Sequence, residues 1–203
     1  GVALITPFNE DFSIDYESFE KLISYNINSG IDYLVINGTT GESPNVSLDE
    51  RNEIISFVSK INNNRLPIIL GIGGNNTVKV VEEINNTELD NISAILSVSP
   101  YYNKPTQQGI YEHYKYIASN CLLPILIYNV PGRTSQNITP TTILRLADDF
   151  DNIVGVKEAS GDFNQYLELI KNKPDNFLII SGDDDLAMEV VQSGGHGVIS
   201  VIA

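Results

Sequence analysis

The sequence predicts an α/β fold of the (β/α)8 barrel type, also called a TIM barrel, in which eight parallel strands alternate with helices. Eight short runs rich in β-branched residues recur along the 203 residues, and successive runs begin 20 to 34 residues apart. The runs are continuously apolar, as expected for parallel strands that are buried on both faces. Amphipathic segments lie between them, so the repeating unit is a strand followed by a helix.

The eight predicted strands are bounded by glycine, proline, asparagine or charged residues. In chain order they lie within residues 2–8, 33–38, 67–73, 92–100, 124–131, 153–160, 177–184 and 197–203. An open doubly wound sheet usually has about five or six parallel strands, so eight in succession favour a closed barrel whose eighth strand pairs with the first. We expect a single barrel domain over residues 1–203, truncated after strand eight, with the eighth helix beyond Ala203.

Three of the helices between these strands have recognisable starts. The segment YESFEKLISYNI, which begins at Tyr16, gathers its apolar residues on one face at the helical period. Ser47 followed by Glu50 predicts a capping box at the start of the next helix. Thr139 before Pro140 predicts an N-cap with proline at the first helical position.

The composition is that of an acidic globular protein. The 26 acidic and 12 basic residues give a net charge of −14, which repels phosphate backbones and anionic membranes and argues against a nucleic-acid or membrane partner. The longest apolar runs are too short to cross the roughly 30 Å of hydrocarbon in a bilayer. A single Cys121 and two histidines provide neither a disulfide nor a zinc site, so we expect no metal and a reducing cytoplasm.

Catalytic groups of a (β/α)8 barrel lie at the C-terminal ends of the strands and in the loops that follow them. Applied to this chain, that rule selects a short set of polar segments. They are residues 39–42 after the second strand, 101–102 after the fourth, 128–133 after the fifth, Lys157 at the end of the sixth, and 181–184 after the seventh.

Lys157 is the most informative member of this set. Of the eight lysines in the chain, it alone lies within an apolar strand, in IVGVKEAS. Burial disfavours the charged ammonium and lowers the pKa of a lysine, and the neutral amine attacks carbonyl carbons to form a Schiff base. A strand-end salt bridge is the structural alternative, and the residue alone does not decide between the two.

Two neighbouring elements fit carbonyl chemistry. Tyr128 ends the fifth strand, where its hydroxyl can shuttle protons for the amine, although packing at the barrel rim is the alternative for a single tyrosine. The GTTGES turn offers two hydroxyls and backbone N–H groups near Gly38 and Gly41, a set suited to a small carboxylate. By itself, that turn is also an ordinary glycine-containing connection from strand to helix.

Two further motifs do not support another chemistry. GIGGNN at residues 71–76 lacks the lysine and hydroxyl ending of a phosphate loop and does not complete the G-x-G-x-x-G pattern. SGDDD at 181–185 offers carboxylates to a magnesium ion, but consecutive acids on a turn do not all face one ion. Acidic residues also favour a helix N-terminus because of its dipole, so we expect no metal site there.

Six motifs occur in the order and spacing of the pyruvate-dependent class I aldolase superfamily, and together they most resemble the dihydrodipicolinate synthase family. They are GTTGES, YYNKPTQQGIYEHY, YNVPGRT, GVKEASGD, SGDD and GGHGVISV, and they span essentially the whole chain. The resemblance implies a lyase that uses no cofactor and forms a Schiff base between Lys157 and pyruvate. The pyruvate enamine would then add to aspartate semialdehyde, in the diaminopimelate route to lysine, within a cytoplasmic homotetramer.

The resemblance also assigns roles to individual residues. Tyr128, Thr40 and Tyr102 would form a proton relay, with Tyr102 reaching into the site of a neighbouring subunit. Thr39 and Thr40 would bind the pyruvate carboxylate. Further substrate contacts would be Gly182 and Ile199.

Arg133, in YNVPGRT, separates this family from its relatives. A guanidinium at the pocket mouth suits the carboxylate of aspartate semialdehyde through bidentate hydrogen bonds, whereas N-acetylneuraminate lyase lacks an arginine in the corresponding loop. A 2-keto-3-deoxy sugar acid aldolase would keep Lys157 and Tyr128 without needing Arg133. A non-catalytic pyruvate-binding relative is the remaining functional alternative, and a surface salt bridge is the structural one for Arg133.

Finally, the resemblance implies an allosteric lysine-binding pocket at a subunit interface. Its lining would be Ser43, Pro44, Leu48, Arg51, Asn75, Lys79 and Tyr101. Lysine-sensitive relatives have a glutamate where this chain has Lys79, and often a histidine where it has Arg51. Two positive charges repel the cationic amine of the effector, so we expect lysine to inhibit weakly or not at all.

Overall fold

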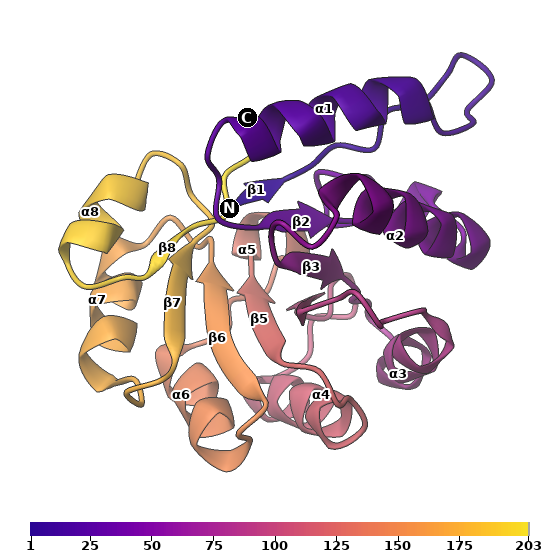
Figure 1. Cartoon of the computed structure of the whole chain (residues 1–203). Helices are drawn as coiled ribbons and strands as arrows, with labels where there is room; N and C mark the ends of the chain where they lie inside the picture. Colours follow the sequence, from indigo (N-terminus) through magenta and orange to yellow (C-terminus); the bar gives the residue numbers. More distant parts are fainter. Residues whose placement is uncertain (203) are drawn as a thin grey trace.

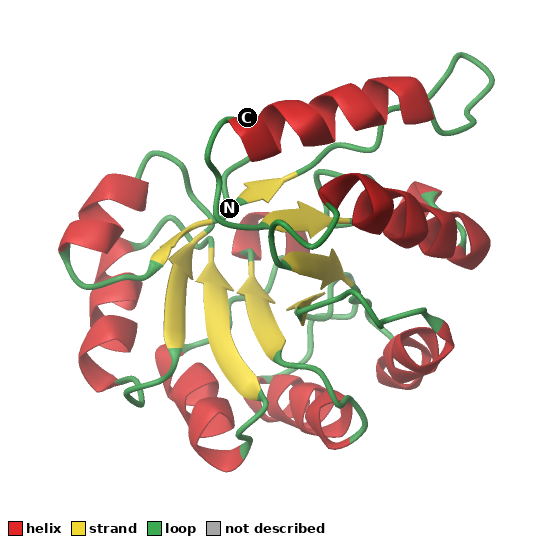
Figure 2. Cartoon of the chain, in the orientation of Figure 1, coloured by secondary structure: helices red, strands yellow, loops and turns green. Residues whose placement is uncertain are grey.

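The computed structural model describes residues 1–202, which form a barrel of parallel strands surrounded by helices (Figures 1 and 2). Each strand pairs with the next one along the chain, and all of these pairs are parallel. The strands are β1 (Val2–Ala3), β2 (Leu34–Ile36), β3 (Ile68–Gly71), β4 (Ala94–Val98), β5 (Ile125–Asn129), β6 (Ile153–Glu158), β7 (Leu178–Ser181) and β8 (Gly197–Val198). Every strand lies inside a predicted run, and the predicted fold class is confirmed.

The barrel closes where the segment after β8 meets β1. Val2 and Ser200 form a parallel bridge. The Ala3 N–H donates to the Ser200 carbonyl at 2.9 Å, and the Ser200 N–H donates to the Gly1 carbonyl at 3.0 Å. The two chain ends therefore lie close together at this seam (Figure 1). The first strand is therefore paired with Ser200, two residues beyond β8 and within the predicted run 197–203, which closes the barrel.

Helices form the outer layer of the molecule (Figure 2). They are α1 (Tyr16–Asn28), α2 (Leu48–Asn62), α3 (Thr77–Asn86), α4 (Gln107–Ser119), α5 (Pro131–Thr134), α6 (Pro140–Asp149), α7 (Phe163–Asn172) and α8 (Ala187–Gln192), with a 3-10 turn, η1, at Ser43–Asn45. α5 and η1 were not predicted, because each is a single turn embedded in a loop that follows a strand.

The predicted helix starts are mostly confirmed. α1 begins at Tyr16, and α2 begins with a complete capping box. In that box the Glu50 N–H donates to the Ser47 hydroxyl at 3.3 Å, and the Ser47 N–H donates to the Glu50 carboxylate at 2.8 Å. Thr139 is the N-cap residue of α6, but its hydroxyl makes no capping hydrogen bond. It lies 3.2 Å from the side-chain oxygen of Gln107 on α4 instead.

Alternation along the strands divides the core into two layers. The inner layer fills the barrel with Ala3, Val35, Ile69, Ala94, Leu96, Leu126, Tyr128, Val130, Ile180 and Ile199. The outer layer packs between strands and helices and is the larger of the two. Along β6, Val156 belongs to the outer layer, so its neighbour Lys157 points into the barrel and Glu158 points toward the helices. The two sides of one strand end therefore carry different polar groups.

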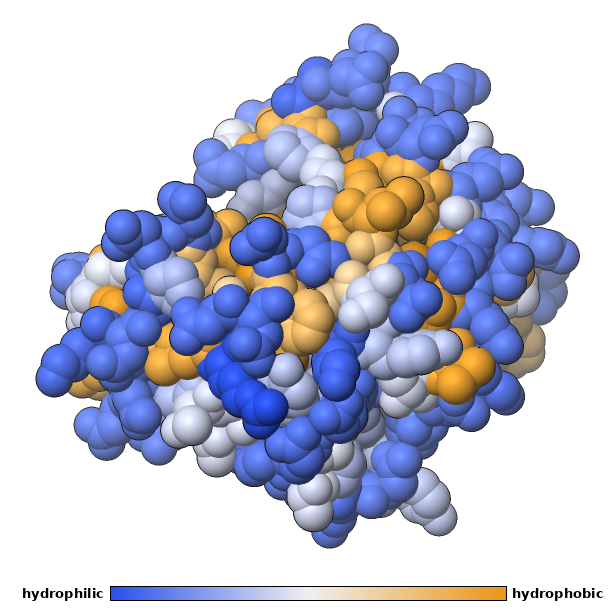
Figure 3. All heavy atoms as spheres, turned by 90° about the horizontal axis from the view of Figure 1, so that it is seen from below, coloured by the Kyte–Doolittle hydropathy of each residue, from blue (hydrophilic) through white to orange (hydrophobic). Residues whose placement is uncertain are grey.

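Hydrophilic residues cover most of the face shown in Figure 3, where apolar residues form separate patches. This surface agrees with the excess of acidic residues in the sequence. Within residues 1–202, the helices are all too short or too polar to cross a membrane.

Candidate active site

Strands β5 and β6 bring Lys157 and Tyr128 together inside the barrel. The two residues are register partners, and the Lys157 Nζ atom lies 4.6 Å from the centroid of the Tyr128 ring. Only 4% of Lys157 and 8% of Tyr128 is exposed. Because both strands end here, the pair lies at the C-terminal end of the barrel, where enzymes of this fold carry their catalytic groups.

Burial is the main influence on the Lys157 amine. Desolvation lowers its pKa to about 8, because the ammonium loses more hydration than the neutral amine. Asp184 and Asp183 oppose this shift by attraction, and Arg133 adds to it by repulsion. No acidic group within residues 1–202 forms a salt bridge with Lys157. The strand-end ion pair considered from the sequence is therefore not formed in the described part of the chain.

The Tyr128 hydroxyl holds its proton more firmly than a free phenol. Burial raises its pKa, while the Arg133 guanidinium and the Thr39 hydroxyl favour the phenolate and offset part of that rise. A neutral phenol beside a buried amine can donate a proton to a reacting oxygen and recover it afterwards.

Gly182 and Ile199 share the interior with this pair. A Cβ atom at position 182 would lie 2.8 Å from Cε of Lys157, so glycine leaves the space that the lysine side chain occupies. The Gly182 N–H donates to the Glu158 carbonyl at 2.7 Å, which fixes this close approach. Ile199 is fully buried in the inner layer with Tyr128.

A cavity of about 440 Å³ opens beside Tyr128. Its wall includes Thr39, Tyr128 and Arg133, three of the residues assigned to substrate binding and catalysis from the sequence. Lys157 is not part of this wall, since its amine lies against the Tyr128 ring. Thr40 and Tyr102 are also absent from the wall.

Hydrogen bonds inside the GTTGES turn after β2 use some of its backbone donors. The N–H groups of Gly41, Glu42 and Ser43 donate to carbonyls within the turn, so the Gly41 amide is already used. In the described chain, the N–H groups of Thr39 and Thr40 have no backbone acceptor. These two amides and their hydroxyls are the donors that the turn can present to an anion.

Arg133 and Tyr102 are both exposed, but only Arg133 lines the cavity. Arg133 lies on α5 and is close enough to influence the pKa values of Lys157 and Tyr128. Within residues 1–202 it has no acidic partner, so the surface salt bridge considered from the sequence is not formed there. Tyr102 is 89% exposed, and its backbone is left-handed with a φ of 73°.

The residues assigned to an allosteric pocket are divided between two places. Ser43, Arg51 and Tyr101 line the same cavity as Tyr128, whereas Asn75 and Lys79 do not. The set therefore does not line one cavity within a single chain, and the pocket expected at a subunit interface stays a prediction. Lys79 is exposed near the start of α3 and does not line the cavity.

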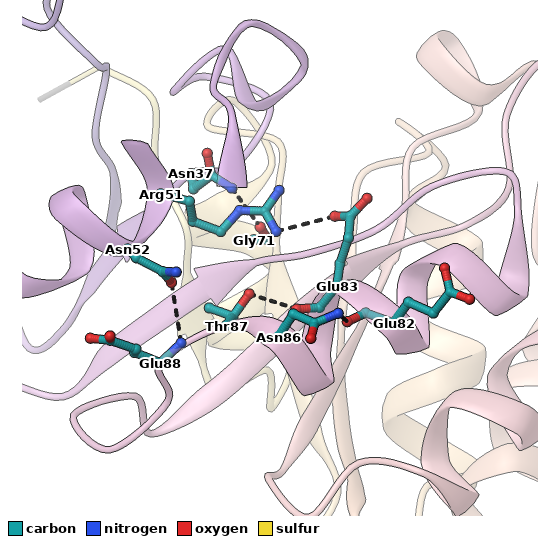
Figure 4. A network of polar contacts seen from close by, with 9 residues as sticks. All are labelled: Asn37, Arg51, Asn52, Gly71, Glu82, Glu83, Asn86, Thr87 and Glu88. Carbon is teal, nitrogen blue, oxygen red and sulfur yellow. Dashed lines mark hydrogen bonds and ion pairs between the residues drawn. The ribbon is translucent and has the colours of Figure 1, made fainter. Parts of the chain in front are cut away.

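The structure also corrects the charge assigned to Arg51. Its guanidinium pairs with the Glu83 carboxylate at 3.1 Å, and only 7% of Arg51 is exposed (Figure 4). Glu83 therefore neutralises the positive charge that the sequence interpretation treated as free. Asn37 lies on the same cavity wall, donating its amide N–H to the Gly71 carbonyl at 3.0 Å.

Sequence reasoning missed the roles of several acidic residues around the site. Glu83 belongs to a different helix from Arg51, so nothing local connects the two. Asp183 and Asp184 lie in the segment selected after the seventh strand, but no individual role was assigned to them from the sequence, and both influence the Lys157 pKa. Their position directly after β7, next to β6, is the signal that identifies them once the barrel topology is known.

Together, these residues define a (β/α)8 barrel with a buried lysine amine of lowered pKa beside a buried tyrosine, an arrangement suited to covalent chemistry with carbonyl compounds. The dihydrodipicolinate synthetase family model matches residues 1–203, and the chain belongs to this family. It is 54% identical over 202 residues to the 4-hydroxy-tetrahydrodipicolinate synthase of Flavobacterium psychrophilum, an alignment that covers 100% of this chain and 69% of the relative.

Solved structures agree with this assignment. The dihydrodipicolinate synthase of Thermotoga maritima has a TM-score of 0.96 and 42% identity, covering 100% of this chain and 69% of its own. The dihydrodipicolinate synthase of Acinetobacter baumannii, solved in complex with pyruvate, has a TM-score of 0.94 and 42% identity, covering 98% of this chain and 68% of its own. The recognition made from the six sequence motifs is confirmed.

We predict that the Lys157 amine titrates near pH 8 and that Asp184→Asn moves its midpoint to lower pH. The substitution removes a carboxylate whose attraction favours the ammonium, so the neutral amine forms more readily. The intact protein is labelled over a range of pH with a small acid anhydride, which acylates neutral amines and releases a carboxylate. Peptide mass spectrometry then gives the extent of Lys157 acylation at each pH and hence the midpoint. Asp185→Asn is the matched control, because the exposed Asp185 does not influence this pKa. A wild-type midpoint near 10.5, the ordinary lysine value, would contradict the effect of burial.

Proposed function

We propose that this chain condenses pyruvate with L-aspartate 4-semialdehyde to 4-hydroxy-tetrahydrodipicolinate through a Schiff base on Lys157. The observation that carries the proposal is the buried Lys157 amine, whose lowered pKa supplies a neutral nucleophile at the end of β6. The names of the relatives support this choice of substrates, and the pyruvate complex of the Acinetobacter baumannii enzyme supports the first of them. We place this biosynthetic reaction, which needs no cofactor, in the cytoplasm.

The covalent steps use the groups that lie at the strand ends. The neutral Lys157 amine adds to the keto carbon of pyruvate, and the keto oxygen takes a proton from Tyr128. The carbinolamine, which still carries the extra proton on nitrogen, loses water to give a protonated imine, and a methyl proton returns to the Tyr128 phenolate as the enamine forms. The enamine carbon attacks the aldehyde carbon of the semialdehyde, and the aldehyde oxygen takes a proton from Tyr128. The amino group of the semialdehyde then replaces Lys157 at the imine carbon, which closes the ring and frees the lysine.

The carboxylates of the two substrates need separate donors. For pyruvate, the Thr39 and Thr40 amides, which have no backbone acceptor within residues 1–202, support a binding role together with the two hydroxyls, because consecutive N–H groups in a turn suit a small anion. The Thr40 hydroxyl also joins the proposed proton relay. For the semialdehyde, Arg133 supplies a guanidinium at the cavity wall that has no acidic partner within residues 1–202. Gly182 and Ile199 bound the space around the covalent adduct.

Tyr102 completes the proposed relay from a neighbouring subunit. Its side chain is 89% exposed and lies off the cavity wall, as expected for a group that acts outside its own chain. We therefore propose a homo-oligomer, with the tetramer of the family as the expected form. Each site would contain Lys157 and Tyr128 from one subunit and Tyr102 from the next.

The first prediction of this function is that borohydride reduction with pyruvate covalently labels Lys157 and that Lys157→Ala abolishes both labelling and turnover. The reason is that reduction traps the imine on the amine that formed it. Peptide mass spectrometry of the intact protein identifies the labelled residue. Labelling at the exposed Lys104 in place of Lys157 would contradict the assignment.

Arg133→Ala separates the two substrates in the same assay. Loss of a charge-assisted contact costs about 1.5–3 kcal/mol, so kcat/KM for the semialdehyde should fall about ten- to 150-fold. Pyruvate labelling should be unchanged when it is compared well above pH 8, where Lys157 is neutral with or without Arg133. Arg145→Ala, at an exposed arginine on α6, is the control. Equal loss in both steps would mean that Arg133 is structural, and loss in neither would favour a sister aldolase.

Mixing two inactive variants tests the shared site. Tyr102→Phe subunits keep Lys157, and Lys157→Ala subunits keep Tyr102, so hybrid assemblies should contain some sites with both groups intact. We expect steady-state activity to appear on mixing, above that of either variant alone. Confirmed hybrids without activity would place Tyr102 in the site of its own chain or outside the mechanism.

We predict that free lysine inhibits this enzyme weakly or not at all. Arg51 is neutralised by Glu83, so the remaining repulsion comes from Lys79, which stands where the family resemblance implies a glutamate in sensitive relatives. Half-inhibition below about 1 mM in a steady-state lysine titration, equivalent to about −4 kcal/mol of binding, would contradict this prediction. Lys79→Glu should increase sensitivity, whereas Lys115→Glu on α4, the matched surface control, should not.

A further inference from the structure

A second register pair lies directly beside the lysine and tyrosine, on the opposite face of the same strands. Asn129 on β5 pairs with Glu158 on β6, one position after Tyr128 and Lys157. Alternation turns these two side chains outward, into the layer between the barrel and the helices. Both are fully buried, with no exposed surface. A carboxylate in this position is as unusual as the lysine beside it.

Uncharged hydrogen-bond donors surround the Glu158 carboxylate. The Asn129 amide donates to both of its oxygens, at 2.9 and 3.0 Å. The Gln165 amide donates at 2.8 Å, and the Ser160 backbone N–H donates at 2.8 Å. Within residues 1–202, no lysine, arginine or histidine forms a salt bridge with Glu158. The carboxylate therefore joins the ends of β5 and β6 to α7 through directional hydrogen bonds alone.

The same network reaches the segment that follows Arg133. The Asn129 side-chain oxygen accepts from the Ile138 N–H at 3.0 Å, and its amide donates to Asn137 at 2.8 Å. The Asn137 amide donates to Gln165 at 2.8 Å, which closes the ring of contacts. Residues 137 and 138 follow α5 after a short loop. Asn129 thus fixes the chain on both sides of the turn that carries Arg133.

A second branch leads to one of the acids that influence Lys157. The Glu158 carbonyl accepts hydrogen bonds from the Tyr166 hydroxyl and from the Gly182 N–H. The Tyr166 hydroxyl also lies 3.1 Å from an Asp183 carboxylate oxygen. The backbone and side chain of Glu158 therefore connect to β5, to α7 and to the segment that follows β7.

We infer that the Asn129–Glu158 pair positions the reactive groups, holding Lys157 and Tyr128 opposite each other and setting the turn that carries Arg133. This inference rests on the proposed Schiff-base function. The pair touches no substrate, so both members are positioning residues. A displacement of about 1 Å between reacting groups can lower a rate by about 100-fold. A small shift of one strand end would therefore slow the reaction strongly.

Stability alone does not account for the pair. Burial raises the Glu158 pKa, and the hydrogen-bond donors around it offset only part of that rise. Keeping the carboxylate ionised there therefore costs free energy of folding. Apolar side chains of similar size usually stabilise such a position at least as well as a buried polar network does. What they cannot supply is a directional link between two strand ends and a loop.

Exchanging the carboxylate and the amide between positions 158 and 129 tests this inference. Glu158→Gln places two amides opposite each other, and Asn129→Asp places two carboxylates opposite each other. Neither substitution changes the size of the side chain appreciably. Each single variant should lower kcat of the intact protein about 10- to 100-fold, with a smaller change in KM. The double variant restores one acid and one amide, so it should recover part of the loss, because contacting residues are coupled.

Asn62→Asp is the matched control. Asn62 is 2% exposed and bonds the Leu66 backbone at the end of α2, away from the strand ends that carry the site. This variant should unfold more easily than the wild type but keep its kcat. Gln165→Met provides a milder test if the single variants do not fold, because Glu158 then keeps its other donors. It should lower kcat several-fold and slow the pyruvate labelling of Lys157.

The outcomes separate this inference from the proposed function. Reduced kcat in the single variants, recovery in the double variant and unchanged kcat in Asn62→Asp would support positioning. Unchanged kcat in the folded single variants, or in Gln165→Met, would overturn it while pyruvate still labels the wild-type Lys157. Absence of labelling in the wild-type protein would overturn the proposed function, and this inference with it.

Discussion

The site depends on holding the Lys157 amine inside the barrel away from any acidic partner among residues 1–202. Desolvation lowers its pKa from 10.5 to about 8, and each unit corresponds to 1.36 kcal/mol, so the ammonium costs the fold about 3 kcal/mol at pH 7. Because the folded pKa is the lower one, this cost is fully present below about pH 8. It is lost as the pH rises toward 10.5, where the unfolded chain also becomes neutral. The apolar inner layer that makes the ammonium unfavourable also keeps the Lys157 amine neutral and nucleophilic at a lower pH.

Because side chains alternate along the strands, the reactive residues lie on the inner face of the barrel and the residues that position them lie on the outer face. On β5 and β6, the inward positions carry Tyr128 and Lys157, and the outward positions carry Asn129 and Glu158. A shift of register by one residue would exchange the two pairs, placing the acid in the barrel and the amine among the helices. Hydrogen bonds on the outer face oppose such a shift without entering the space where substrates bind. The reactive groups on the inner face and the hydrogen bonds on the outer face therefore require the same register of β5 and β6.

The sequence predicted the barrel and the reactive lysine because both produce local patterns. Continuous apolar runs identified all eight strands, and the position of Lys157 within one of them placed the amine at a strand end. Contacts between distant segments were not accessible in that way. The Arg51–Glu83 pair joins two helices, and the use of the Gly41 amide inside its own turn depends on backbone geometry. Glu158 gave a local signal, a carboxylate after five strand residues, but its meaning required knowing that Asn129 lies opposite.

The acidic character of the chain is compatible with the anionic substrates that we propose. A net charge of −14 is spread over the surface, and charges more than about 8 Å away are largely screened at physiological ionic strength. Within that distance, individual charged groups and hydrogen-bond donors determine whether an anionic substrate is attracted or repelled. Asp183 accepts hydrogen bonds from the Gly161 N–H and the Tyr166 hydroxyl, which limits its repulsion of a substrate. Arg133 places at the cavity wall a guanidinium that has no acidic partner among the described residues. Local donors can therefore capture an anion on a protein whose overall field repels it.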